Sequence, residues 1–308
     1  MDKTDMTARM SAFARGYYAA LAGTEAVYAD LAAKRLLSQQ EWEAMEQSLY
    51  DGAAFFGADG AAFFGADGAG DRRAVVGRIV LKQLAATPVF RAAFIERALL
   101  GAVRLGARQY GILGCGLDGF SVCPPPWAAG IACFALDRPE MLADRAQRLE
   151  RAGADAERET RVPADFLVHD PLAALMDCPS FDSEAPCFFS LAGVLQYLPH
   201  DAAERLFAGI GRLPAGTAAA FDCPMADTAA DAAQNRRAML AAAAGAPMRA
   251  GWTMRALEAA LERAGLLIYE HCTPRQIEAQ FGNRNTAPDR RLSAERGVHL
   301  VLAVKKPC

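Results

Sequence analysis

Seven short apolar runs constrain the fold of this 308-residue chain more than any other feature of its sequence. They lie at residues 109–113, 131–136, 161–164, 186–192, 217–221, 266–270 and 298–304. Each run is continuously apolar rather than alternating, which is typical of strands buried on both faces of a parallel sheet. Helical patterns separate most of the runs, and parallel strands need such crossover connections. The sequence therefore predicts a sheet with helices on both faces.

The helical patterns lie at 89–105, 139–152, 200–212 and 253–264. The last of them begins at Thr253, a typical N-cap residue, and ends just before Gly265. The two final strands follow this one helix and are joined by a long polar loop, which permits an antiparallel pair. We therefore predict an α/β fold with a Rossmann-like, doubly wound, seven-stranded and mostly parallel sheet whose last strand is antiparallel.

Residues 5–50 have helical periodicity and no strand pattern, so the sequence predicts an N-terminal helical cap over residues 1–72. The cap contains a tandem repeat of DGAAFFGA, which we expect in a loop at 51–67. Either a tolerant surface loop has been duplicated, or the repeat forms a Phe-bearing flap over a site. Residues 73–308 then form the core, with a lid insertion at about 223–252 between the fifth and sixth strands.

Charge and cysteine content argue against several classes of protein. Lys and Arg total 33 against 36 Asp and Glu, so nucleic-acid binding through bulk positive charge is not expected. No apolar stretch approaches the roughly 18–20 residues that span a bilayer, so no membrane partner is expected. The eight cysteines form no C-x-x-C pair, which favours a reduced, cytoplasmic protein without a metal site. The sequence leaves the oligomeric state open.

A glycine-rich segment, Gly114-Cys-Gly-Leu-Asp-Gly119, directly follows the first predicted strand. Its glycines allow a tight turn and a close approach of the backbone to a ligand. Asp137, eighteen residues beyond Gly119, closes the second strand, where its carboxylate can accept hydrogen bonds from ribose hydroxyls. This is the dinucleotide-binding pattern, and an NAD-dependent oxidoreductase that uses the Gly114–Gly119 loop is one interpretation of it.

The residues after this loop favour a different nucleotide. A pyrophosphate needs a helix N-terminus directly after the third glycine. Here three prolines, Pro124 to Pro126, follow instead and cannot support a regular helix. A ligand with ribose and adenine but no pyrophosphate fits better, and S-adenosyl-L-methionine is such a ligand.

Four segments carry a resemblance to a known family. RQYGILGCGLD, FALDRPEML, VPADF and FFSLAGVLQYL follow one another at the ends of successive predicted strands. In that order they resemble the leucine carboxyl methyltransferase-like family of class I S-adenosylmethionine-dependent O-methyltransferases, over about residues 75–308. The resemblance implies S-adenosyl-L-methionine as cofactor and S-adenosyl-L-homocysteine as product. The family includes bacterial enzymes for small molecules and protein C-terminal carboxyl methyltransferases, so both kinds of acceptor stay open.

The resemblance also implies which residues hold the cofactor. The glycine loop passes beneath its methionine part, Asp137 binds the ribose, and Asp165 faces the adenine amino group beside Phe166. An arginine on the helix before the first strand binds the cofactor carboxylate, with Arg91 the best match and Arg97 the second. The implied cofactor site comprises Arg15, Arg91, Gly114, Cys115, Gly116, Asp137, Arg138, Asp165, Phe166 and Ala192.

Two departures from the family pattern stand out. Gly119 and Phe120 occupy the positions where the family usually has Thr-Arg, so a polar contact is missing. After the fourth strand the family commonly has Glu-Gly, whereas this chain has Ala192-Gly193. That glutamate often touches cofactor or substrate, so inference of the substrate from better-known members is weakened.

Methyl transfer from a sulfonium is an in-line displacement, which depends mainly on proximity and orientation. A carboxylate acceptor is ionised at neutral pH, whereas a hydroxyl acceptor needs a positioned base. Tyr197 and His200, after the fourth strand, are the candidate catalytic residues, and His299 inside the last strand is a structural residue. The candidate acceptor-binding residues are Tyr17, Tyr18, Trp252 and Arg284. We therefore expect an O-methyltransferase for a small-molecule acceptor, with a carboxylate favoured over a hydroxyl.

Overall fold

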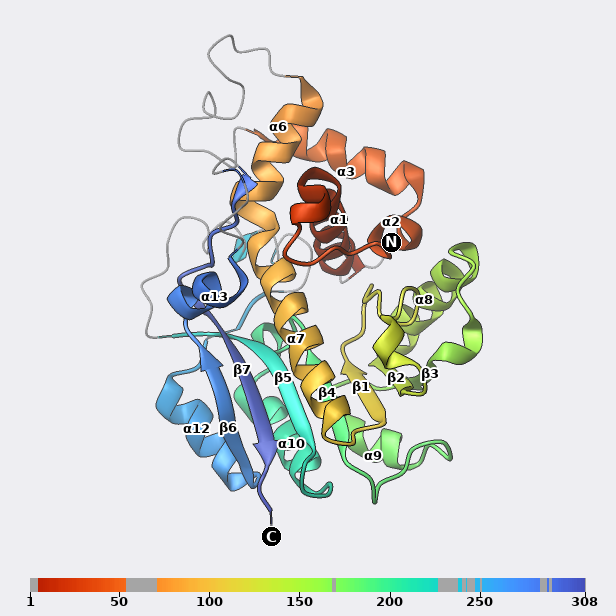
Figure 1. The fold of residues 1–308 in the computed structure, drawn as a ribbon, viewed down its shortest axis with the longest axis vertical. Coiled ribbons are helices and arrows are strands. Elements are labelled where there is room, and N and C mark those ends of the chain that lie inside the picture. The colour runs from red at the N-terminus through yellow and green to blue at the C-terminus, as the bar shows by residue number, and fades with distance from the viewer. Residues whose placement is uncertain are drawn as a thin grey trace.

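A sheet of seven strands runs through the middle of the computed structural model of this protein (Figure 1). The strands are β1 (Gln109–Leu113), β2 (Ala132–Asp137), β3 (Thr160–Pro163), β4 (Cys187–Leu191), β5 (Ala218–Pro224), β6 (Leu266–Cys272) and β7 (Val298–Lys305). Their order is β3-β2-β1-β4-β5-β7-β6, with β1 to β5 parallel and β7 antiparallel to both of its neighbours. The predicted fold class is confirmed, and each apolar run forms a strand.

The structure describes residues 5–53, 71–167, 170–226, 238–239, 242, 247–249, 251–282, 287 and 290–307. The helices are α1 (Asp5–Ala22), α2 (Ala33–Leu36), α3 (Gln39–Asp51), α6 (Arg72–Ile79), α7 (Ala86–Arg104), α8 (Pro139–Arg151), α9 (Pro171–Met176), α10 (His200–Gly211), α12 (Met254–Arg263) and α13 (Pro274–Phe281). All but the first three residues of the predicted repeat loop, and Arg284, lie outside the described residues.

Helices cover both faces of the sheet and pack on two apolar clusters. One cluster joins side chains of α1, α3, α6 and α7 to the sheet, and the other joins side chains of α9, α10 and α12 to its opposite face. Phe188 belongs to the first cluster and Phe189 to the second, so neighbouring residues of β4 face opposite layers. Burial on both faces explains why the strands are continuously apolar.

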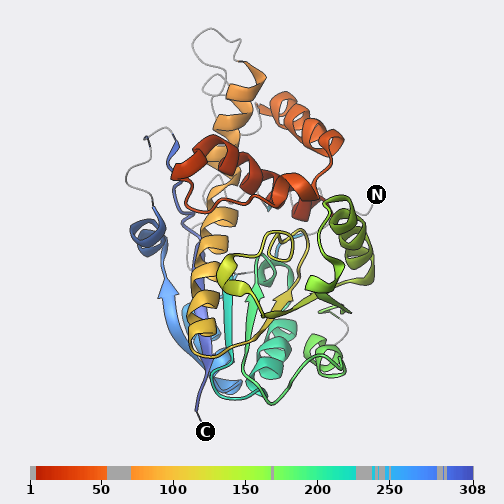
Figure 2. The same ribbon diagram turned by 45° about the vertical axis from the view of Figure 1, so that its right-hand side comes forward.

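The N-terminal helices lie beyond the carboxyl ends of the parallel strands (Figures 1 and 2). Phe13 and Tyr17 of α1 pack on Trp42 of α3, with ring centroids 4.6 and 5.9 Å away. Their apolar cluster continues without a break to Phe90 of α7 and Tyr110 of β1. The division into a cap over 1–72, a core over 73–308 and a lid at 223–252 stays a prediction, but cap and core share this cluster.

Several elements were not expected from the sequence, among them α6, the helix α13 and a π-helical turn. The polar connection between the last two strands contains α13, which begins with Pro274 and a capping box between Thr273 and Gln276. A π-helical turn, Val80–Leu84, joins α6 to α7, and α7 begins at Ala86 rather than at residue 89. The π-helical turn and α13 are too short to show a clear hydrophobic periodicity, so the sequence pattern did not predict them.

Candidate active site

A cavity of about 440 Å³ lies at the carboxyl ends of β1, β2, β3 and β4. The segments that follow these four strands form one side of it, and residues of α1 and of the start of α7 form the other. In doubly wound sheets, ligands bind at this end of the parallel strands. The volume is within the range of small-molecule sites, which hold roughly 300–1,000 Å³.

The glycine loop after β1 forms part of the cavity wall with an unusual backbone. Gly114 has φ 73° and Gly116 has φ 42°, both in the left-handed region that favours glycine. A Cβ on Gly114 would lie 2.5 Å from Cγ2 of Val194. A Cβ on Gly119 would lie 2.5 Å from the Cβ of Ala32, so this third glycine serves packing against the α1–α2 connection.

Two arginines hold three successive carbonyl groups of this loop. Arg145 of α8 donates through Nη1 to the carbonyl oxygens of Gly116 and Asp118, at 3.0 and 2.8 Å. Arg15 of α1 donates through Nη2 to the Leu117 carbonyl at 2.9 Å. Arg145 is fully buried and forms an ion pair with Glu159 at 2.7 Å, so its guanidinium has a fixed place. The sequence pattern gave no sign of this role of Arg145.

Asp137 ends β2 at the edge of the cavity. Its Oδ2 accepts a hydrogen bond from the Gly116 amide, and its Oδ1 accepts one from the Arg138 amide, both at 2.9 Å. Burial raises the pKa of this carboxyl group, while the two amides favour its ionised form. A carboxylate oxygen has two lone-pair sites, so each can accept a further donor such as a ribose hydroxyl.

Asp165 and Phe166 follow β3 and line the same cavity. Oδ1 of Asp165 accepts a hydrogen bond from the Leu167 amide at 2.9 Å, which fixes the turn after the strand. The second oxygen of Asp165 remains for a donor such as an amino group on a planar ring.

Arg91 and Arg15 meet at one hydroxyl group. Ser11 Oγ accepts from Nη2 of Arg91 at 3.0 Å and from Nη1 of Arg15 at 2.8 Å. Arg15 also pairs with Asp30 at 2.7 Å. Two guanidinium groups at one wall of the cavity favour an anionic ligand group there.

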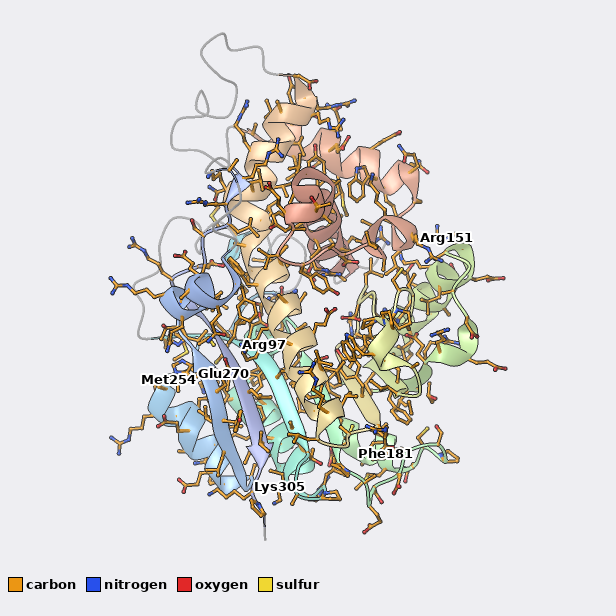
Figure 3. The ribbon with its side chains drawn as sticks, in the orientation of Figure 1. Arg97, Arg151, Phe181, Met254, Glu270 and Lys305 are labelled. Carbon is orange, nitrogen blue, oxygen red and sulfur yellow. The ribbon has the colours of Figure 1, made fainter. Side chains whose placement is uncertain are left out.

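Arg97, the second candidate for this role, lies elsewhere. It pairs with Glu270 of β6 at 2.7 Å (Figure 3). Its guanidinium also packs over the ring of Phe281. Arg97 is two turns along α7 from Arg91, on the part that faces β6 and α13. Arg91 is therefore the arginine of this helix that lines the cavity.

The residues predicted to hold the cofactor come together in this cavity. All ten line it, from Arg15 on α1 to Ala192 after β4. Tyr197, a predicted catalytic residue, also lines it. Burial raises the pKa of the Tyr197 phenol, so this group is protonated at neutral pH and its hydroxyl can donate a hydrogen bond.

His200 lies outside the lining of the cavity. It is the first residue of α10 and exposed, and its ring stacks on Trp252 with centroids 4.0 Å apart. Trp252 is buried and pairs through its backbone amide with the Pro224 carbonyl at the end of β5. Predicted to bind the acceptor, Trp252 instead anchors the end of the lid segment in the core.

Tyr17 and Tyr18, also predicted to bind the acceptor, are buried among the N-terminal helices. The Tyr17 hydroxyl donates to the Arg73 carbonyl at 3.2 Å, and the Tyr18 hydroxyl accepts from the Val27 amide at 3.1 Å. Both tyrosines lie near the end of α1, whereas the residues of α1 that line the cavity lie nearer its start. Periodicity identified the apolar residues of the helix but not the turn that reaches the cavity.

The sequence did not identify most of the remaining lining. These residues come from α1, from the π-helical turn and the start of α7, from the turn after β4, and from the lid segment. They include Thr7, Met10, Ser11, Leu84, Thr87, Gln196 and Met248. Ser11 could have been identified from the sequence, because it precedes the predicted site residue Arg15 by one helical turn and so lies on the same face of the helix. In the lid segment, the Arg249 amide donates to the Gln196 carbonyl at 2.7 Å, which holds Met248 near the turn after β4.

Comparison with known families decides between the interpretations left open by the sequence. The model of the leucine carboxyl methyltransferase family matches residues 8–211. The chain belongs to this family. YktD of Bacillus subtilis, named as an S-adenosyl-L-methionine-dependent methyltransferase, is 31% identical over 314 residues, which cover 99% of each chain. A protein of Mycobacteroides abscessus with the same kind of name is 37% identical over 122 residues, or 40% of this chain and 39% of that protein.

Two solved structures share the fold of this leucine carboxyl methyltransferase family member. A DUF574 family protein from Streptomyces avermitilis gives a TM-score of 0.53 at 19% identity, over 80% of this chain and 95% of that one. A protein from Thermobifida fusca, named as a methyltransferase, gives 0.51 at 16% identity, over 80% and 92%. The family match and YktD make the protein a methyltransferase that depends on S-adenosyl-L-methionine. The NAD-dependent interpretation is therefore set aside.

The cavity residues fit this cofactor. Gly114 and Gly116 leave the backbone free of side chains, Asp137 offers acceptors for ribose hydroxyls, and the two arginines suit a carboxylate. The segment after Gly119 runs through turns to a short 3₁₀ turn at Pro126–Ala128, so no helix N-terminus stands there for a pyrophosphate. When bound, the cofactor supplies a methyl group on a positively charged sulfonium.

Within the described residues, no helix is long and apolar enough to cross a membrane. Nor do three or more His, Cys, Asp or Glu side chains of these residues gather as metal ligands would.

Proposed function

We propose that the protein transfers the methyl group of S-adenosyl-L-methionine to an oxygen of a small-molecule carboxylate. The observation that carries this proposal is the composition of the cavity wall beyond the residues assigned to the cofactor. Met10, Leu84 and Met248 are apolar, while Gln196 and Tyr197 carry neutral amide and hydroxyl groups. Such a wall suits a compact ligand with an apolar body and one polar end.

A carboxylate acceptor suits the protonation state of this wall. The Tyr197 phenol has a raised pKa, so it is protonated at neutral pH and suits a hydrogen-bond donor better than a base. The imidazole of His200, the other candidate base, stacks on Trp252 outside the cavity lining. A carboxylate is already ionised at neutral pH and attacks without a base, so orientation supplies most of the rate acceleration.

The test uses S-adenosyl-L-methionine with a radioactive methyl group and matched pairs of small aliphatic or aromatic acids and alcohols. A methyl ester releases volatile methanol in mild alkali, whereas a methyl ether does not. We expect label transfer to acids, in alkali-labile form, at a rate nearly constant between about pH 6 and 8 because the acceptor stays ionised there. Alkali-stable label on hydroxyl acceptors would contradict the carboxylate assignment.

The same assay separates small molecules from proteins as acceptors. Peptides with a free C-terminal carboxylate form one arm, and the same peptides with an amidated C-terminus are the control. We expect label on the small acids and none on either set of peptides. Label that depends on a free peptide C-terminus would favour a protein carboxyl methyltransferase instead.

We also propose that the protein works in the cytoplasm. The seven cysteines within the described residues are free thiols, and five of them are buried. Reducing compartments keep such thiols unpaired. Fractionation of cells that express the protein should recover it with the cytoplasmic proteins, and recovery from a membrane or secreted fraction would overturn this location.

A further inference from the structure

A buried carboxylate on β5 lies next to the wall of the cavity. The parallel pairing of β4 with β5 ends at Leu191 and Phe221. One residue further along each strand stand Ala192, which lines the cavity, and Asp222, which is only 2% exposed. The end of β4 thus carries no acidic side chain at residue 192, and its neighbouring strand carries one at the adjacent position.

Asp222 contacts two groups of the cavity wall. Its Oδ1 accepts from the Gly193 amide at 2.5 Å, and its Oδ2 accepts from Nη1 of Arg91 at 3.3 Å. Gly193 has φ 70°, and a Cβ there would lie 2.4 Å from Nη1 of Arg91. The guanidinium group therefore packs directly on the bare backbone of Gly193, and Asp222 holds both the turn and the arginine in place.

These contacts continue across the cavity wall to α1. The other terminal nitrogen of Arg91 donates to Ser11, which also accepts from Arg15, and Arg15 pairs with Asp30. Two arginines are thus held between two carboxylates and share one hydroxyl acceptor. Bidentate recognition of a carboxylate by arginine depends on the orientation of the planar guanidinium, which this arrangement fixes.

We propose that Asp222 is a positioning residue that orients Arg91 for the carboxylate of the bound cofactor. Asp222 acts through Arg91 and the Gly193 turn and need not touch the cofactor itself. This inference rests on the use of S-adenosyl-L-methionine and not on the identity of the acceptor, so equilibrium binding without an acceptor can test it.

The experiment compares two nucleosides by isothermal titration calorimetry. S-adenosyl-L-homocysteine contains the amino-acid end that Arg91 would hold, whereas 5′-methylthioadenosine lacks it. In Asp222→Asn, which keeps an oxygen for the Gly193 amide but loses the charge, we expect the Kd for S-adenosyl-L-homocysteine to rise at least about tenfold. The Kd for 5′-methylthioadenosine should stay unchanged. Glu204→Gln, which removes an exposed carboxylate paired with Arg263, is the matched control and should change neither Kd.

A second variant tests whether a carboxylate on the adjacent strand end can replace that of Asp222. Ala192→Glu combined with Asp222→Asn returns a carboxylate to the adjacent strand end, and we expect it to recover most of the lost affinity for S-adenosyl-L-homocysteine. Thermal melting without ligand confirms that each variant is folded. Unchanged or tighter S-adenosyl-L-homocysteine binding by Asp222→Asn would overturn the proposal. So would an equal loss of affinity for both nucleosides, or a double variant that binds S-adenosyl-L-homocysteine as weakly as Asp222→Asn alone.

Discussion

The two ends of the cavity are built in different ways. Eight of the ten residues assigned to the cofactor end or follow successive parallel strands, while Arg15 and Arg91 come from α1 and α7. Hydrogen bonds donated by Arg145 and Arg15 and accepted by Asp137 fix the backbone of the glycine loop. The residues at the other end come from segments far apart in the chain, namely α1, the turn before α7, the turn after β4 and the lid segment. The end proposed for the cofactor is therefore preorganised, and the end proposed for the acceptor is assembled from separate parts.

This difference predicts different consequences of substitution. Changes at the cofactor end should lower stability or cofactor affinity, because they disturb buried charges and fixed backbone groups. Changes at the acceptor end should leave both nearly intact and alter turnover of the acceptor.

The largest effect is expected for Arg145→Met. This substitution leaves Glu159 buried without its main partner and frees two carbonyl groups of the glycine loop. We expect the free energy of unfolding to fall by about 3 kcal/mol in chemical denaturation. Arg158→Met removes an exposed pair with Asp155 at 3.8 Å and serves as control, with an expected loss below about 1 kcal/mol. Equal losses in the two variants would contradict the assigned role of Arg145.

Asp137→Ala tests the cofactor end more directly. Loss of the charged acceptor should weaken S-adenosyl-L-homocysteine binding by about 1–3 kcal/mol in calorimetry. Asp201→Asn, at an exposed aspartate paired with Arg205 on α10, is the control and should bind normally. If the affinity of Asp137→Ala equals that of the wild type, the ribose is not bound at the end of β2.

Tyr197→Phe tests the acceptor end. If Tyr197 donates a hydrogen bond to the ionised carboxylate of the acceptor, its removal should lower kcat/KM for the acceptor by a factor that corresponds to about 1.5–3 kcal/mol and leave S-adenosyl-L-homocysteine affinity unchanged. Tyr17→Phe loses a hydroxyl that donates to the Arg73 carbonyl. It should therefore reduce stability slightly and leave kcat/KM intact. The reverse pattern would place the acceptor near Tyr17 rather than Tyr197.

The smallest effect on activity is expected for His200→Ala. The ring of His200 stacks on Trp252, so its loss should cost roughly 0.5–1.5 kcal/mol of stability and leave turnover of a carboxylate acceptor unchanged. Steady-state kinetics and thermal melting of the same preparation separate the two effects. A large fall in kcat without a fall in stability would indicate hydroxyl chemistry with His200 as base.

Much of the fold was predictable because buried parallel strands have a strong local signal. All seven runs form strands within a few residues of the predicted bounds, and Thr253 caps α12 as expected. That Gly114, Asp137 and Asp165 line one cavity was predictable for a related reason, since they end or follow strands whose carboxyl ends meet at one edge of the sheet.

The acceptor end was not predictable from local patterns. Tyr17 and Tyr18 are large aromatic residues on the correct helix, yet the cavity is lined by residues one to three turns earlier, such as Thr7 and Met10. Asp222 lies inside an apolar strand. The pairing of β4 with β5 brings it to Gly193, and the packing of α7 against β5 brings it to Arg91. Such contacts depend on tertiary packing, which a single sequence does not specify.

A crystal structure with S-adenosyl-L-homocysteine bound tests the central claim most directly. We expect the ribose hydroxyls within hydrogen-bond distance of Asp137 and the amino-acid carboxylate within hydrogen-bond distance of Arg91. The sulfur atom should then face the wall that contains Tyr197 and Met248. A ligand bound outside this cavity, or one whose amino-acid end points away from Arg91, would contradict the account.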